Sequence, residues 1–198
     1  EINSVPTHLS ENPESINSNY YRDDSVTDDP ELAKKYAQLG KQWATKLYCS
    51  HGYEVIDSNE IGYDLVCRKA GESLKVEVKA ITFNRPNIRF NETTWQQMTK
   101  YQDTYEVFIF SHGQDATKEL IRIRKAGLTF HEVLSKLPNT NALYNSGEIE
   151  SLIGLQLNKS EMGNDIMFKW HRLLKNASHD AIEKYEYDSA TCTFHKIS

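Results

Sequence analysis

The residues of this sequence with the clearest capacity for chemistry are Asp64, Glu77 and Lys79. They fall in two short segments with the composition of β-strands, on either side of a turn. On a β-hairpin, Asp64 near the start of one arm can face Glu77 late in the other, so that two carboxylates converge on one hard cation. Lys79 projects from the same face as Glu77, because side chains alternate along a strand. The three residues therefore predict one charged centre.

Phosphodiester hydrolysis is the chemistry that suits this set. It needs a nucleophilic water, neutralisation of charge on the phosphate and a stabilised leaving oxygen, and a carboxylate-bound magnesium ion can supply all three. Lys79 can orient or deprotonate the attacking water. A plainer interpretation stands beside this one, because Glu-x-Lys on an exposed strand is commonly a solvated pattern with a cross-strand ion pair.

The elements that must position the centre are a helix and a series of strands. A helix is expected to start at Asp29-Pro30 and to stop at Gly52, with apolar residues at intervals of three and four between them. The turn at 69–73 predicts a hairpin. The other expected elements are strands at 53–57, 63–69 and 74–81, a short strand at 88–90, a helix at 93–101, and strands at 105–111 and 120–124 that pair with each other.

The pattern weakens after residue 127. Phe130–Leu137 and Asp165–Leu174 are predicted to be helical, 149–157 is ambiguous, and 191–197 is a candidate terminal strand. The first residues are polar and acidic, with few large aliphatic side chains to bury. We therefore expect a flexible acidic tail at 1–28, a nuclease core at 29–127, and a C-terminal extension at 128–198 that is rich in helix and helps to bind the substrate.

The charge is distributed unevenly along the chain, whose net charge is −5. Residues 1–31 hold eight of the 28 acidic residues and one of the 23 basic residues, so the remainder has a net charge of +2. A near-neutral body is compatible with a nucleic-acid partner, but does not by itself predict one, because binding depends on a clustered basic face.

Several other classes of protein are disfavoured. No stretch approaches the roughly 20 apolar residues needed to cross a bilayer, and there is no secretory signal, so we expect no membrane association and an intracellular, cytoplasmic location. The three cysteines are odd in number and widely spaced, which suits free thiols and not a zinc site or a disulfide framework. There is no Gly-rich phosphate loop for an ATPase and no nucleophile elbow for a hydrolase triad.

From about Leu39 to Ser111 the sequence resembles the PD-(D/E)xK nuclease superfamily, and within it the domain named after the C-terminal region of the plant protein NO VEIN. The resemblance does not cover the last 85 or so residues. It rests on Gly40, His51-Gly52-Tyr53, Gly62-Tyr63-Asp64, Glu77-Val78-Lys79, the segment Ile88-Arg89-Phe90-Asn91-Glu92-Thr93-Thr94-Trp95, and the strand Tyr105-Glu106-Val107-Phe108-Ile109-Phe110.

The resemblance implies a restriction-endonuclease-like α/β core of order α-β-β-β-α-β, with a central mixed sheet flanked by helices. It also implies that Asp64, Glu77 and the backbone carbonyl of Val78 hold Mg²⁺, for which Mn²⁺ can substitute, and that Lys79 assists the water. Many relatives carry a glutamate on the first helix where this chain has Lys41-Gln42, so Gln42 is a candidate to orient a metal-bound water. Gln97 and Tyr101 resemble the Q-x-x-x-Y helix of RecB-like members, in which both residues lie near the active site.

Basic residues in and after the core are candidate contacts to DNA phosphates. On the later predicted helix, a solvated face with Trp170 in the core is an equal alternative. The candidates are Arg85, Arg89, Lys100, Arg122, Arg124 and Lys125 near the core, and Lys169, His171, Arg172 and Lys175 around Trp170.

The sequence and the resemblance together predict a magnesium-dependent DNA endonuclease of restriction or defence type. The alternative is a catalytically inactive module that keeps the fold and binds nucleic acid or docks a partner protein. A third interpretation is a structural domain in which Glu77 and Lys79 merely pair. A homodimer is expected if both strands of a duplex are cut. Because the chain begins at Glu1 and not at a methionine, additional domains or subunits are also compatible with the sequence.

Overall fold

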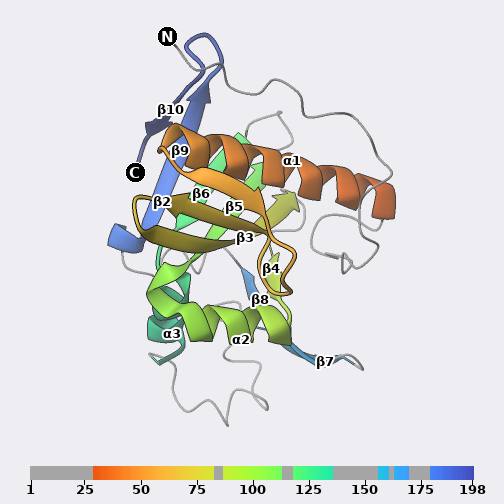
Figure 1. Ribbon diagram of the computed structural model, residues 1–198. Coiled ribbons are helices and arrows are strands. Elements are labelled where there is room, and N and C mark those ends of the chain that lie inside the picture. Colours follow the sequence, from red (N-terminus) through yellow and green to blue (C-terminus); the bar gives the residue numbers. More distant parts are fainter. Residues whose placement is uncertain (1–28, 83–86, 113–117, 136–155, 161–162, 170–178) are drawn as a thin grey trace.

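The computed structural model describes residues 29–82, 87–112, 118–135, 156–160, 163–169 and 179–198. Helix α1 (Pro30–Ser50) begins as predicted, because the Asp29 side chain accepts hydrogen bonds from the backbone amides of Glu31 and Leu32. Its apolar face packs on a β-sheet, and Figure 1 shows the helix lying across that sheet. No helix in the described part of the chain is long and apolar enough to cross a membrane.

The main sheet has seven strands in the order β1-β2-β3-β5-β6-β9-β10. The central pair β3 and β5 is parallel, and every other neighbouring pair is antiparallel. The predicted mixed α/β class is thereby confirmed. The strands are β1 (Glu54–Asp57), β2 (Leu65–Lys69), β3 (Glu72–Thr82), β5 (Tyr105–His112), β6 (Lys118–Ile123), β9 (Ile182–Asp188) and β10 (Thr193–Lys196).

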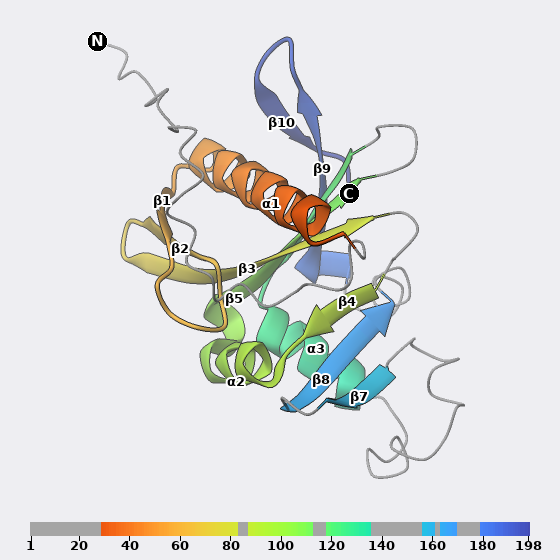
Figure 2. The same cartoon turned by 90° about the vertical axis from the view of Figure 1, so that its right-hand side faces the viewer.

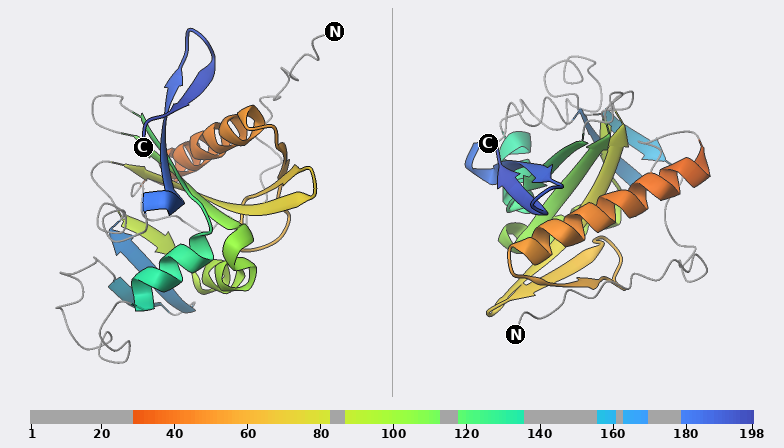
Figure 3. Two further views of the ribbon diagram at one scale, coloured as in Figure 1. Left: turned by 90° about the vertical axis from the view of Figure 1, so that its left-hand side faces the viewer. Right: turned by 90° about the horizontal axis from the view of Figure 1, so that it is seen from above.

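A second layer covers the face of the sheet opposite α1, as Figures 2 and 3 show. It consists of helices α2 (Glu92–Tyr101) and α3 (Ala126–Ser135) and a three-stranded sheet of order β4-β8-β7. The strands of this small sheet are β4 (Asn87–Phe90), β7 (Gln156–Ser160) and β8 (Gly163–Lys169), and the short 3-10 turns η2 (Gln102–Thr104) and η3 (His179–Ala181) complete the described elements.

Two hydrophobic cores result, one on each face of the main sheet. On β3, Val76 and Ala80 belong to the core under α1, whereas Ile81 belongs to the core under α2 and α3. The predicted two-residue alternation of this strand is therefore confirmed, and it sends Glu77 and Lys79 towards the side of α2 and β4.

The described residues of the C-terminal extension lie mainly in strands and not in helices, which corrects the prediction for that part of the chain. Residues 165–169 of the expected helix Asp165–Leu174 lie in β8, and 170–174 lie outside the described residues. Strand β8 pairs with β4 on one side and β7 on the other. Its short apolar run Ile166–Phe168 fits either a helix or a strand, and these pairings decide the outcome.

Strand β9 was not predicted, because a buried carboxylate occupies an inward position where an apolar residue is expected. Glu183 is 7% exposed, and its neighbour on the same face, Tyr185, is 5% exposed. Strands β9 and β10 continue the main sheet beyond β6. The aromatic rings of Tyr187 and Phe194 then pack on Trp43 of α1, with centroids 4.9 and 6.2 Å away. The sheet therefore does not end at residue 127.

Gly40 sets the distance between α1 and the sheet. A Cβ atom at this position would lie 3.2 Å from Val78 Cγ1 and 3.4 Å from Phe110 Cβ. A larger side chain would push the helix away from β3, where the candidate centre lies.

We predict that Gly40→Leu lowers the free energy of unfolding by about 3 kcal/mol, the upper end for overpacking a core. Urea denaturation followed by circular dichroism measures this change. Gln38→Leu, on the exposed side of the same helix, is the matched control and should alter stability little. Equal effects of the two substitutions would contradict the close approach at Gly40.

Candidate active site

The hairpin of β2 and β3 brings the two predicted carboxylates together. Its turn has positive φ at Ala70 and Gly71, 41° and 88°, and its register pairs Leu65 with Val76. One step further along, Asp64 lies opposite Glu77. The backbone amide of Asp64 donates to the carbonyl of Val76 at 2.9 Å. The hairpin and its placement of these residues were predicted correctly.

The Asp64 carboxylate is held against β3. Its Oδ2 accepts a hydrogen bond from the backbone amide of Val78 at 2.7 Å, and the Asp64 carbonyl accepts from the amide of Ser58 at 2.8 Å. The Val78 amide thus fixes the Asp64 side chain, and the Ser58 amide fixes its backbone. The recorded contact of Val78 is made by its amide, and a role of its carbonyl as a metal ligand stays a prediction.

Glu77 and Lys79 form a buried ion pair on one face of β3. Lys79 Nζ lies 2.9 Å from Glu77 Oε1, and the side chains are only 12% and 9% exposed. The Lys79 ammonium also lies 5.6 Å from the centroid of the Phe90 ring on β4. A solvated strand pattern, the plainer interpretation of Glu-x-Lys, does not describe this pair, because both charges are largely withdrawn from water.

The carboxylates of Asp64 and Glu77 repel each other electrostatically in this buried centre. Burial, followed by the Glu77 charge, raises the pKa of Asp64 from 3.8 to about 7, against the opposing effects of the Val78 amide, Lys79 and Lys41. A carboxyl group with this pKa readily accepts a cation in exchange for its proton.

Tyr105 on β5 borders the same centre. Burial and then the charges of Glu77 and Asp64 raise the pKa of its phenol well above the ordinary value. The phenol donates a hydrogen bond to the backbone carbonyl of Gly62, which fixes the loop immediately before Asp64. Tyr105 therefore acts here as a neutral, positioning group.

Lys41 is the residue of α1 whose charge reaches the centre, and sequence reasoning missed it. Lys41 Nζ lies 3.3 Å from Asp57 Oδ1 at the end of β1, and its charge lowers the pKa of Asp64. Gln42, the predicted candidate, is exposed. The signal for Lys41 is its position directly after Gly40, where α1 comes closest to β3.

Gln97 on α2 packs against the loop that carries Asp64, as the resemblance implied. A Cβ atom on Gly62 would lie 2.7 Å from Gln97 Cγ, so only glycine fits here. Gln97 Oε1 is buried and has no hydrogen-bond partner in the described structure. Tyr101, one turn further along α2, stacks edge-on with Tyr63 at 6.1 Å. Both residues of the Q-x-x-x-Y pattern thus contact residues 62–63.

The donor set of the centre fits a hydrated Mg²⁺ or Mn²⁺. Asp64 and Glu77 provide hard carboxylate oxygens. Mg²⁺ commonly binds through one or two carboxylates and keeps several waters. Within the described residues, no group of three or more His, Cys, Asp and Glu side chains could hold a metal, so a site built entirely from protein ligands does not fit.

Apart from Arg122, the predicted DNA contacts divide into three groups. Arg85, His171, Arg172 and Lys175 lie outside the described residues. Arg89 and Lys169 belong to the adjacent strands β4 and β8. The exposed residues are Lys100 at the end of α2, and Arg124 and Lys125 between β6 and α3.

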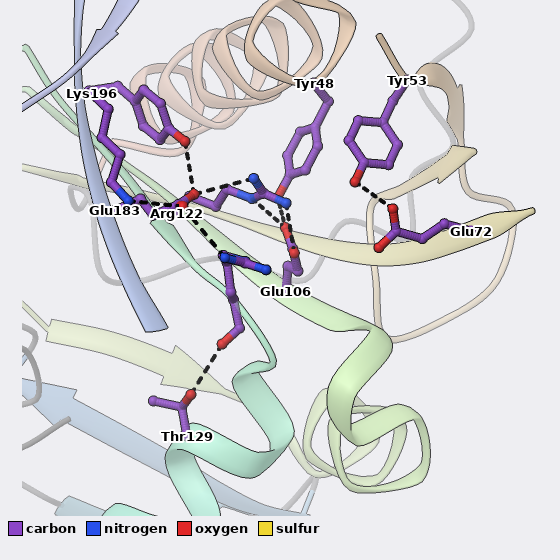
Figure 4. Close-up of polar contacts among 10 residues, drawn as sticks. Tyr48, Tyr53, Glu72, Glu106, Arg122, Thr129, Glu183 and Lys196 are labelled. Carbon is purple, nitrogen blue, oxygen red and sulfur yellow. Dashed lines mark hydrogen bonds and ion pairs between the residues drawn. The ribbon is translucent and has the colours of Figure 1, made fainter. Parts of the chain in front are cut away.

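Arg122 does not have the predicted role, because its guanidinium is buried between carboxylates (Figure 4). It donates to both Glu106 oxygens at 2.7 and 2.8 Å and to Glu183 at 3.2 Å. Burial lowers the pKa of Arg122, but the hydrogen bonds to Glu106 together with the charges of Tyr48, Glu106 and Glu183 raise it above its ordinary value. Tyr48 and Tyr185 donate to the same two carboxylates at 2.6 and 2.8 Å. This cluster joins α1, β5, β6 and β9, and its ion pairs give Arg122 a structural role.

A polar cleft of about 380 Å³ adjoins this cluster. Its lining carries both signs of charge. Within it, Tyr53 donates to Glu72 at 2.7 Å and Lys69 donates to the His51 carbonyl at 2.6 Å. None of Asp64, Glu77 and Lys79 lines the cleft. We therefore place the candidate active site at the hairpin.

Comparison with known families gives one match. Residues 37–123 match the family model described as Protein NO VEIN, C-terminal. The matched segment runs from α1 to the end of β6 and contains Asp64, Glu77 and Lys79, and the family is associated with the PD-(D/E)xK nuclease-like fold. No curated protein matches the chain.

The pKa of Asp64 generates a prediction about stability. Because the folded-state pKa of about 7 exceeds the ordinary 3.8, the folded protein binds the proton more tightly, and the contribution of Asp64 to stability falls as the pH rises between these values. Asp64→Asn removes this penalty and keeps an acceptor for the Val78 amide. It should raise the free energy of unfolding at pH 8 by on the order of 2 kcal/mol in a chelating buffer.

Thermal melting at pH 5 and pH 8 measures this effect. Asp103→Asn, at an exposed carboxylate, is the matched control and should leave the pH profile of the parent unchanged. Glu77→Gln should bring no such gain, because it removes the carboxylate that pairs with Lys79. An Asp64→Asn protein that melts below the parent at pH 8 would show that the two carboxylates do not repel.

Proposed function

We propose that this protein is a metal-dependent DNA endonuclease with a restriction-endonuclease-like core. The observation that carries the proposal is the convergence of Asp64, Glu77 and Lys79 in one buried centre on the β2–β3 hairpin. The order α1-β1-β2-β3-α2-β5, with β4 inserted before α2, supports the proposed core. The family match over 37–123 supports it independently.

Each residue of the centre has a role in phosphodiester hydrolysis. Asp64 and Glu77 would hold Mg²⁺ or Mn²⁺, and the bound ion would neutralise the phosphate and activate water. Lys79 holds its ammonium between the Glu77 carboxylate and the Phe90 ring, where it can orient the attacking water and offset charge in the transition state. The Val78 amide fixes the Asp64 carboxylate, so the reacting groups are positioned before the substrate binds.

The biological setting belongs to the same proposal. We propose an intracellular role of restriction or defence type, with double-strand cleavage by a homodimer, because cutting both strands of a duplex requires two active centres. Additional domains or subunits would supply the choice of DNA sequence.

A second candidate function is an inactive module that binds nucleic acid or docks a partner protein. Two observations favour it. The centre has two carboxylates and a lysine on the first helix where many relatives have an acid, and Glu77 is already paired with Lys79 at 2.9 Å. Both features weaken the attraction for a cation, and a fold can persist after its chemistry is lost.

Cleavage of plasmid DNA and of modified and unmodified linear DNA tests the proposal. We expect cutting by the parent chain with Mg²⁺ or Mn²⁺, none in chelator, and a loss of at least about 100-fold in Lys79→Ala, a magnitude typical of a general acid–base group. Lys34→Ala, at an exposed lysine early in α1, should cut like the parent.

Circular dichroism must show that Lys79→Ala is folded, since it leaves Glu77 without its partner. Asp64→Asn is the second variant and is expected to be stable and inactive. Metal-dependent cutting by both variants would show that cleavage does not depend on the proposed centre. The absence of cutting by the parent on every substrate would favour the inactive module.

A further inference from the structure

A second cationic cluster lies on the same side of the sheet as the candidate active site. Lys75 precedes Glu77 by two residues on β3 and therefore projects to the same face. Its Nζ lies 4.9 Å from the centroid of the Tyr101 ring, and Lys100 Nζ lies 5.0 Å from the same centroid. One tyrosine at the end of α2 thus gathers two ammonium groups, one from the strand and one from the helix.

The charge of this cluster is not balanced within the described structure. Among the residues described, no carboxylate lies within 4.0 Å of Lys75 or Lys100, and the one other recorded contact of Lys75 is a hydrogen bond to Ser73 Oγ at 3.3 Å. Lys100 at the C-terminal end of α2 complements the helix dipole, but that does not explain the second charge. Two ammonium groups against one ring bind an anion more strongly than either alone.

The cluster also lies close to the proposed cleavage centre. A strand rises roughly 3.3 Å per residue, so Lys75 is about 7 Å from Glu77 along β3. The Tyr101 ring contacts Tyr63 at 6.1 Å, and Tyr63 contacts Tyr105 at 6.5 Å. Tyr105 in turn borders Asp64 and Glu77. A row of aromatic rings therefore connects the two lysines to the carboxylates.

We propose that Lys75 and Lys100 form a binding subsite for a backbone phosphate of the substrate DNA strand, next to the phosphodiester that is cut. This inference rests on the proposed function. Tyr101 holds both ammonium groups against its ring, at 4.9 and 5.0 Å from the centroid. The subsite places the strand, and the carboxylates and Lys79 act on the neighbouring phosphate.

Binding measured without cleavage tests the subsite separately from the nuclease. Fluorescence anisotropy of a labelled DNA duplex in chelating buffer, at several salt concentrations, gives the slope of log K against log salt concentration. Because both lysines are proposed to bind one phosphate, the double variant Lys75→Gln/Lys100→Gln should lower the magnitude of the slope by about 0.9, and each single variant by less. The double variant should bind at least about 10-fold more weakly at low salt.

Control variants distinguish a loss of DNA binding from a loss of folded structure. Lys34→Gln removes an exposed charge from α1 and should leave the affinity and the slope unchanged, and replacing both lysines with arginine should retain binding. A double glutamine variant that binds like the parent, or that only melts at a lower temperature, would overturn the subsite, as would a parent that does not bind DNA. A parent protein that binds DNA through these lysines but does not cut it would contradict the proposed nuclease activity and still support the phosphate-binding subsite.

Discussion

The structure depends on the convergence of two carboxylates in a buried site that is largely shielded from water. Asp64 and Glu77 lie opposite each other on the β2–β3 hairpin, and their mutual repulsion, added to burial, raises the pKa of Asp64 to about 7. Two compensating interactions keep them in place, the Val78 amide on Asp64 and the Lys79 ammonium on Glu77. Such an arrangement costs stability in the absence of a cation, and it is retained where the charges have a function.

The surrounding helices and strands position the centre formed by Asp64, Glu77 and Lys79. Helix α1 approaches β3 through Gly40 and brings the Lys41 charge near Asp64. Helix α2 packs Gln97 against Gly62 and so fixes the loop that precedes Asp64. On the other face, the ion pairs of Arg122 with Glu106 and Glu183 tie β9 to the central strands. The site and the structural cluster therefore lie on opposite faces of one sheet.

The central hairpin could be predicted from sequence because its information is local. The turn at 69–73 and the alternation of Val76, Glu77, Val78 and Lys79 determine both the register and the face. The rest depends on contacts between distant segments. The proximity of Lys41 depends on how α1 is rotated on the sheet, and Arg122 finds Glu183 in a strand 61 residues later. Segment Gly163–Lys169 becomes strand β8 because it pairs with β4 and β7. Strand β9 has the buried Glu183 at a position where the sequence pattern predicts an apolar residue.

Calorimetric titration with Mg²⁺ and Mn²⁺ tests most directly whether Asp64 and Glu77 form one cation site. We predict that the parent binds one ion per chain near pH 8, that binding weakens as the pH falls through 7 and Asp64 becomes protonated, and that Asp64→Asn abolishes it. Asp103→Asn should bind like the parent. A folded parent that binds neither ion, or an Asp64→Asn protein that binds as tightly as the parent, would contradict a cation site formed by Asp64 and Glu77.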